Sequence, residues 1–213
     1  MAEQKRNYFE GPAAELRLRE LGLEVSWLVD AVRASEIERR SCSPLEPSIA
    51  PGFKAWSAAF RRLAEELVPR GWAKTETLNL PRLVNKSTAV AVAVSSGNEA
   101  TGTSNEPDFK NTRGEVSKLL IRTNQRQLVL FAEMQYVPIP AEEEQKTWWL
   151  LIYSDDSGVL RAELGLPIRL GGDAELSMWE QRIVIDIPNL DQPSIPESDE
   201  EPPEILVNVR PKS

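Results

Sequence analysis

The sequence predicts an α+β fold in which N-terminal helices pack on an antiparallel sheet of about five strands. Apolar residues recur at helical spacing in the first third of the chain, and after Trp72 their period changes to two, which is typical of strands. The chain has 213 residues, of which 41% are hydrophobic, so one sizeable core can form. We therefore expect a single domain in which the helices precede the sheet.

The helices are expected in two stretches. Residues 12–40 form the first, since Pro12 suits a first turn and apolar residues follow on one face. Gly22 interrupts this pattern, so we expect two short helices there. A further helix begins at Phe53 and ends at Pro69. Its apolar stripe is expected to lie in the core and comprises Phe53, Trp56, Phe60, Leu63 and Leu67.

The strands are expected to form two hairpins and a last strand, at residues 72–84, 88–96, 148–153, 160–166 and 182–187. A turn at 155–158 closes the second hairpin, and a short helical turn around Met178 and Trp179 precedes the last strand. Small and branched residues alternate in the second strand, which is therefore expected to be covered on both faces. Arg161 and Glu163 share one strand face and are expected to form a surface pair.

The single domain is expected to span residues 12–187, with an N-terminal extension at 1–11. Residues 97–146 form a long internal connection between the two hairpins, with a short helix at 115–122. Connections of this length are usually functional or disordered. Residues 188–213 are acidic and rich in proline, and we expect them to be a disordered tail.

The composition excludes several chemistries. The chain has no histidine, which excludes Ser-His-Asp and Cys-His catalysis and histidine-ligated zinc. Cys42 is the single cysteine, so the chain can form neither an internal disulfide nor a cysteine-cluster metal site. We therefore expect no cofactor, and the poverty of catalytic residue types favours a protein that is not an enzyme.

Charge and hydropathy limit the partners and the compartment. The net charge of −8 argues against direct binding of nucleic acid. No apolar run approaches the ~18 residues that a membrane-spanning helix requires, so no membrane association is expected. The N-terminal residues lack the apolar stretch of a signal peptide, and the single cysteine suits a reducing compartment. We expect a cytoplasmic protein.

One short motif points to a partner. Gln127, Leu128, Leu130 and Phe131 form the pattern Gln-Leu-x-Leu-Phe, which resembles the linear motif that docks bacterial proteins on the DNA sliding clamp. In that interpretation Leu130 and Phe131 fill an apolar pocket of the clamp, Leu128 packs beside them, and Gln127 hydrogen-bonds at the rim. The alternative is a plain strand, because residues 128–137 also have strong β character.

Four carboxylates are weak candidates for binding a ligand or a metal ion: Glu99, Asp108, Glu133 and Glu163. An Asp followed by a strand Glu-x-Gln or Glu-x-Lys resembles the pattern of some magnesium-dependent nucleases, but the lysine is absent here. The loop of Glu99 contains two glycines, which let a backbone approach a ligand or simply form a polar turn. A metal-dependent hydrolase or nuclease is therefore the alternative function.

The segments that characterise the chain are RELGLEVSWLVDAVR, SCSPLEPSIAPGFKAW, AVAVSSGNEATG, QLVLF, TWWLLIY, RAELGLP and WEQRIVI. Together they resemble an uncharacterised family of bacterial proteins over roughly residues 12–187. The resemblance implies the limits of the domain but no activity. The expected function is thus an interaction protein that docks on the sliding clamp or a similar groove, in DNA metabolism or a process related to mobile elements or phages. A third possibility is a structural subunit of a larger assembly, with the acidic tail as its partner arm.

Overall fold

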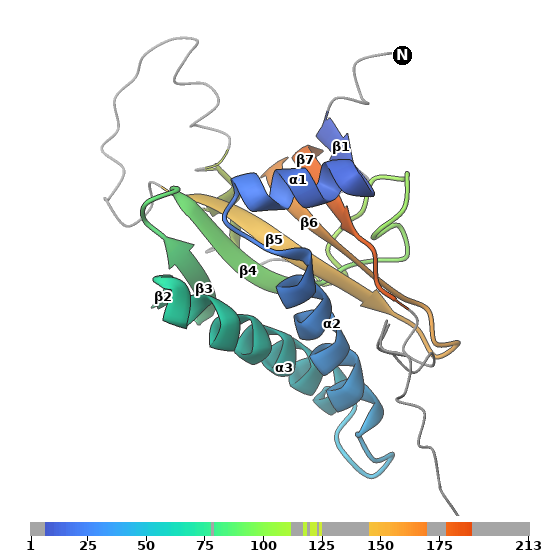
Figure 1. The fold of residues 1–213 in the computed structure, drawn as a ribbon. Coiled ribbons are helices and arrows are strands. Elements are labelled where there is room, and N and C mark those ends of the chain that lie inside the picture. The colour runs from blue at the N-terminus through green and yellow to red at the C-terminus, as the bar shows by residue number, and fades with distance from the viewer. Residues whose placement is uncertain are drawn as a thin grey trace, which may run out of the picture.

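The computed structural model describes residues 7–77, 79–111, 117–118, 120–122, 124, 145–169 and 178–188. In this part of the chain the helices cover one face of a mixed sheet (Figure 1). The helices are α1 (Pro12–Glu20), α2 (Val25–Arg40), α3 (Ala50–Leu67) and the short 3-10 helix η2 (Val68–Arg70). The strands are β1 (Tyr8–Phe9), β2 (Ala73–Thr77), β3 (Leu80–Asn85), β4 (Val90–Ser96), β5 (Lys146–Ser154), β6 (Leu160–Arg169) and β7 (Met178–Ile185).

The α+β class is confirmed, but the sheet has seven strands in the order β1-β7-β6-β5-β4-β3-β2. Two neighbouring pairs are parallel, β4 with β5 and β1 with β7, so the expectation of an antiparallel sheet was wrong. The long connection between β4 and β5 explains the first of these pairs. A parallel pair requires a crossover of a dozen or more residues, and this connection is long enough to bring the chain back to the same end of the sheet.

The helices begin and end near the expected residues. Gly22 adopts a positive φ of 77° between α1 and α2, which confirms the predicted break. Gly71 adopts a φ of 88° after η2 and ends the helical stretch. α3 starts at Ala50 rather than at Phe53, because Pro51 in its first turn lacks only an N–H group that the first turn leaves unbonded.

Three strand predictions need correction. Residues 72–84 are not one strand, since β2 and β3 pair with each other across a turn at Asn79, whose φ is 63°. Trp179 lies in β7 and not in a helical turn. Its ring contacts Gly165 of β6 so closely that a Cβ at that position would approach the ring to 2.6 Å. The N-terminal extension contains β1, which pairs with Arg182 and Ile183 of β7.

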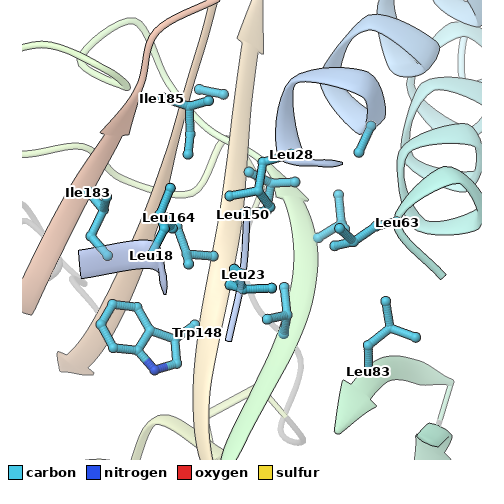
Figure 2. Packing of buried hydrophobic residues seen from close by; sticks show 14 of the residues in the cluster. Leu18, Leu23, Leu28, Leu63, Leu83, Trp148, Leu150, Leu164, Ile183 and Ile185 are labelled. Carbon is cyan, nitrogen blue, oxygen red and sulfur yellow. The ribbon is translucent and has the colours of Figure 1, made fainter. Parts of the chain in front are cut away.

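Adjacent residues of β5 point to opposite faces of the sheet, as the pleat requires. On the helical face, Trp148 and Leu150 join the large core formed by α1, α2, α3 and the strands (Figure 2). On the other face, Trp149 and Leu151 pack with Ala93 of β4. β4 is buried along nearly its whole length, which confirms the prediction that this strand is covered on both faces.

The long connection provides the cover for the second face. Phe109 and Ile121 pack against Trp149 there, and the rings of Phe109 and Trp149 meet edge to face with centroids 5.2 Å apart. Residues 117–118, 120–122 and 124 are helical, in the region where the sequence predicts a short helix. This part of the connection is therefore a structural layer of the domain.

Among the described residues, none of the helices has the combination of length and hydropathy that a membrane-spanning helix requires.

Candidate functional site

An open cleft of about 890 Å³ lies at the carboxyl ends of β4 and β5. We call it the strand-end cleft. Its walls come from the last turns of α2, the first turns of α3, and the segments that follow the two strands. The residues that line it are Ser35, Arg39, Ser48, Ile49, Pro51, Gly52, Phe53, Ala55, Trp56, Asn79, Leu80, Val94, Ser95, Ser96, Gly97, Lys110, Asn111, Ile152, Tyr153, Ser154, Asp155 and Asp156.

The position of the cleft follows from the parallel pairing of β4 and β5. Parallel strands end at the same edge of a sheet, and their chains then leave in different directions, which opens a crevice. Here β4 continues toward the second face, where Gly97 pairs with Phe109, whereas β5 turns sharply into β6. Ligand sites of α/β sheets characteristically occupy this position.

Arg39 crosses one end of the cleft and is held from both sides. Its guanidinium donates to the carboxylate of Glu36 at 2.8 and 3.0 Å and to the backbone oxygen of Asp155 at 3.0 Å. It also lies 3.4 Å from the carboxylate of Asp156. These bonds tie the end of α2 to the β5–β6 turn, so this wall of the cleft has a fixed geometry.

Glu36 is the buried acid on which this wall depends. Its side chain is 1% exposed and also accepts a hydrogen bond from Arg40 at 2.5 Å. Burial alone would raise the pKa of the Glu36 carboxyl, but the hydrogen bonds from Arg39 and Arg40 outweigh burial and hold that pKa below its ordinary value of 4.5. The charged carboxylate therefore stabilises the folded state.

We expect Glu36→Gln to lower the free energy of unfolding by about 1–2 kcal/mol at pH 7, because two charged hydrogen bonds are lost. A folded-state pKa below 4.5 means that this stabilisation is fully present above pH 4.5 and is lost as the pH falls through the folded value. The difference between the wild type and the variant should therefore shrink below pH 4.5. Urea unfolding across pH 3–7 (roughly the range over which carboxyls titrate) measures it.

The matched control is Glu24→Gln. Glu24 is exposed, and its carboxylate lies 3.8 Å from the guanidinium of Arg19, which is also exposed. We expect this change to cost less than about 0.5 kcal/mol at any of these pH values. An equal effect of the two substitutions at pH 7, or a Glu36 effect that does not depend on pH, would contradict the role assigned to Glu36.

The remaining charges of the cleft are not equivalent. The carboxylate of Asp155 accepts hydrogen bonds from the hydroxyl and backbone N–H of Ser157 and from the N–H of Val159, so it serves the turn. The hydroxyl of Ser157 is the main reason that the pKa of Asp155 is lowered. Lys110, in contrast, is exposed and forms no ion pair within the described residues. Its backbone is fixed by a bond to the oxygen of Ser96 at 3.1 Å.

The rim of the cleft is apolar on the side of α3. Ile49 is 75% exposed and Phe53 is 60% exposed, and the ring of Phe53 lies 5.7 Å from that of Trp56. Phe53 therefore does not lie in the core, contrary to the sequence prediction, because it is on the outer side of the first turn of α3. Exposed apolar groups beside a cleft are typical of surfaces that bind a partner.

The structure gives Glu163 a structural role. Its side chain is fully buried and forms a bidentate ion pair with Arg182, at 2.9 and 2.7 Å. The backbone N–H of Gly102 also donates to it at 2.8 Å, and Arg182 in turn donates to the oxygen of Thr103 at 2.9 Å. The expected surface pair of Arg161 and Glu163 is wrong, because residues after β4 fold over β6 and bury this carboxylate.

Arg161 lies apart from Glu163 in its contacts. It donates to the backbone oxygen of Glu99 at 2.5 Å and its guanidinium lies over the ring of Tyr153. Asp108 accepts a hydrogen bond from the N–H of Phe109 at 2.8 Å, within a loop that the amide of Asn98 also orders. Glu99 and Asp108 therefore lie in one loop that hydrogen bonds hold in place.

Glu133 lies outside the described residues. Within the described part of the chain no three His, Cys, Asp or Glu side chains are arranged to hold a metal ion. The two glycines of the loop are explained by local structure. Gly102 has a φ of 69°, and a Cβ on Gly97 would collide with the hydroxyl of Thr101. These observations agree with the polar-turn interpretation of this loop.

The residues of the docking motif, Gln127, Leu128, Leu130 and Phe131, also lie outside the described residues. The nearest described residues on either side of the motif, Asn124 and Gln145, are part of the domain. Asn124 is fully buried, accepts a hydrogen bond from the N–H of Thr147 at 2.9 Å, and donates to the backbone oxygens of Thr147 and Pro167. Gln145 is buried and immediately precedes β5. Residues 124 and 145 are thus fixed at the same end of the sheet.

Comparisons with known proteins leave the chain without an assigned relative, since no protein-family model, no curated protein and no solved structure matches it.

Proposed function

We propose that this chain is an interaction protein that docks on the DNA sliding clamp, or on a similar apolar groove, through Gln127, Leu128, Leu130 and Phe131. The observation that carries the proposal is the Gln-Leu-x-Leu-Phe motif in the 20 residues, 125–144, between two fixed positions of the sheet. Such a protein would act in the cytoplasm, in DNA metabolism or in a process related to mobile elements or phages.

The fixed positions support this proposal energetically. The side chain of Asn124 is bonded to the backbone of Thr147, so the described residues that precede and follow the segment 125–144 lie close together. A binding peptide that is held at both ends loses less freedom when it docks than a free peptide does. The domain would then act as a rigid scaffold that presents the motif to the sliding clamp.

The completed sheet supports the proposal as well. Each interior strand, from β7 to β3, already has both of its neighbours among the described residues. The interior of the described sheet, from β6 to β3, therefore needs no strand from residues 125–144. Positions to pair lie on the outer edges of β1 and β2 and on the part of β7 that the two-residue strand β1 does not cover. The alternative, a plain strand over residues 128–137, is thereby limited to an edge of the sheet.

The motif has the chemistry of an anchor peptide. Complete burial of Leu130 or Phe131 in a groove contributes about 1.5–3 kcal/mol for each side chain. Two such anchors with a rim hydrogen bond from Gln127 are consistent with a dissociation constant on the order of micromolar. Recognition of a short segment by a few apolar side chains is a common mode of docking.

The test is a calorimetric titration of the full chain with a purified bacterial sliding clamp. We expect Leu130→Ala and Phe131→Ala each to weaken binding by about 10- to 100-fold, as loss of one buried anchor requires. Val129→Ala is the matched control, because the position between the two leucines carries no specificity in the motif, and it should change binding by less than about threefold. The absence of binding by the wild type, or equal effects of all three substitutions, would refute the proposal.

A further inference from the structure

We infer that the strand-end cleft binds residues 197–209 of this same chain. In this arrangement the acidic residues from Glu197 to Glu204 lie toward Lys110, and the apolar residues Ile205, Leu206 and Val207 cover the exposed rim at α3. The inference does not depend on the proposed docking motif, because it concerns a different segment and the other end of the sheet.

The exit point of the chain is the first observation. Ile185, at the end of β7, pairs with Ala162 of β6, and Ala162 pairs with Ile152 of β5. Ile152 lines the cleft. Neighbouring strands are about 4.8 Å apart, so the end of β7 lies only about 10 Å from the cleft wall along this row. The chain beyond residue 188 starts close to the cleft.

The chain also leaves on the correct face of the sheet. Ile187 packs against the core between the helices and the sheet. Val94 and Ile152, which line the cleft, belong to the same core. Residues after 188 therefore begin on the helical face and at the edge where the cleft opens.

The docking motif is the other apolar segment that could occupy the cleft, but its segment starts farther from the cleft than the C-terminal residues do. Sixteen residues between positions 188 and 204 reach up to about 50 Å when extended, far more than the path to the cleft requires. Asn124, which precedes the segment 125–144, instead lies beside Thr147 at the opposite end of β5. β5 has nine residues, which corresponds to about 30 Å.

The chemistry of the two surfaces is complementary. Residues 197–204 contain five acidic side chains and no basic one. In the cleft, Asp155 is occupied by its turn and Asp156 faces Arg39, whereas Lys110 has no ion pair within the described residues.

The apolar rim needs cover of matching character. Ile49, the N-cap residue of α3, and Phe53, in the first turn of that helix, are both largely exposed to solvent. Residues 205–207 read Ile-Leu-Val directly after the acidic run. A peptide that is acidic and then apolar matches a site that is basic at one end and apolar at the other. Because both belong to one chain, the effective concentration is high.

The experiment is zero-length carbodiimide coupling of the full chain at low concentration, followed by mass spectrometry of the digested protein. The reagent activates a carboxylate, the deprotonated Lys Nζ attacks it, an amide bond forms, and a urea leaves. We expect Lys110 to couple to acidic residues in 197–204. Lys86 is the matched control, since it is exposed in the turn between β3 and β4 at the opposite end of the sheet, and it should give at least tenfold less of this product.

Two further arms separate the possible occupants. In a one-to-one mixture of unlabelled and nitrogen-15-labelled protein, coupling within one chain gives no mixed-label product, whereas exchange between two copies does. The double substitution Ile205→Ser, Leu206→Ser removes the apolar contact and should lower the Lys110 product several-fold without touching any coupling group. The inference is overturned if Lys110 gives no product, if Lys86 gives as much, if the products are of mixed label, or if the double substitution has no effect.

Discussion

Arg182→Met is expected to lower the free energy of unfolding by about 3–5 kcal/mol, because it leaves a buried carboxylate without its partner. Glu163 is fully buried, and both of its oxygens are bonded to Arg182. The same guanidinium holds the backbone of Thr103, so the substitution also releases the loop that covers β6. Denaturant unfolding followed by tryptophan fluorescence measures the loss.

The control for this prediction is Arg19→Met, which removes ion pairs that are exposed to solvent. It should cost less than about 1 kcal/mol. The double variant Glu163→Leu, Arg182→Met removes both charges, and replacement of a whole buried pair by apolar residues is often close to neutral. It should therefore recover most of the stability lost in Arg182→Met. If Arg182→Met costs no more than Arg19→Met, the ion pair does not hold the two elements together.

Trp149→Ala is expected to cost about 3–5 kcal/mol, the range for removal of a large aromatic side chain from a core. Trp149 has no exposed surface and contacts Phe109 of the long connection. The substitution therefore opens a cavity between the sheet and the layer that covers its second face. Amide hydrogen exchange should show faster exchange at residues 97–111 together with the loss of global stability.

The comparison for Trp149 is Phe53→Ala, which removes an aromatic side chain of similar type from an exposed position. This change should cost less than about 1 kcal/mol. If Trp149→Ala were equally mild, the second face of the sheet would not be a packed core, and the connection would not be a layer of the domain.

The helical half of the fold was predictable because its signals are local. The stripe of apolar residues in α3 repeats at the helical period, and Gly22 and Gly71 occupy the positions with positive φ that end helical stretches. The Asp155 turn was predictable for the same reason, since its side chain bonds the backbone two and four residues ahead. Each of these features depends only on neighbours in the sequence.

The order of the strands was not predictable, because it depends on contacts between distant segments. β4 is followed by a long connection before β5, and nothing in either strand shows that they lie side by side and parallel. β1 has only two residues, too few for a period. Glu163 lies on a strand whose alternating pattern indicates one face exposed to solvent. Residues after β4 cover that face, and among them Gly102 donates a hydrogen bond to Glu163.

The strand-end cleft depends on the same long-range contacts. Ser96 and Ser154 are unremarkable in the sequence and become neighbours of one cavity only because β4 and β5 end at the same edge. Lys110 reaches the cleft through the pairing of Gly97 with Phe109. The docking motif, in contrast, consists of five consecutive residues, so it can be identified from the sequence without knowledge of the fold.

The most direct test of the central claim is a structure of the full chain bound to a bacterial sliding clamp. We expect Leu130 and Phe131 to occupy the apolar groove of the clamp, while the hydrogen bonds between Asn124 and Thr147 remain in place at the base of the segment. A complex in which the clamp is contacted by another surface of the domain, with Leu130 and Phe131 buried in the chain's own core, would contradict the claim.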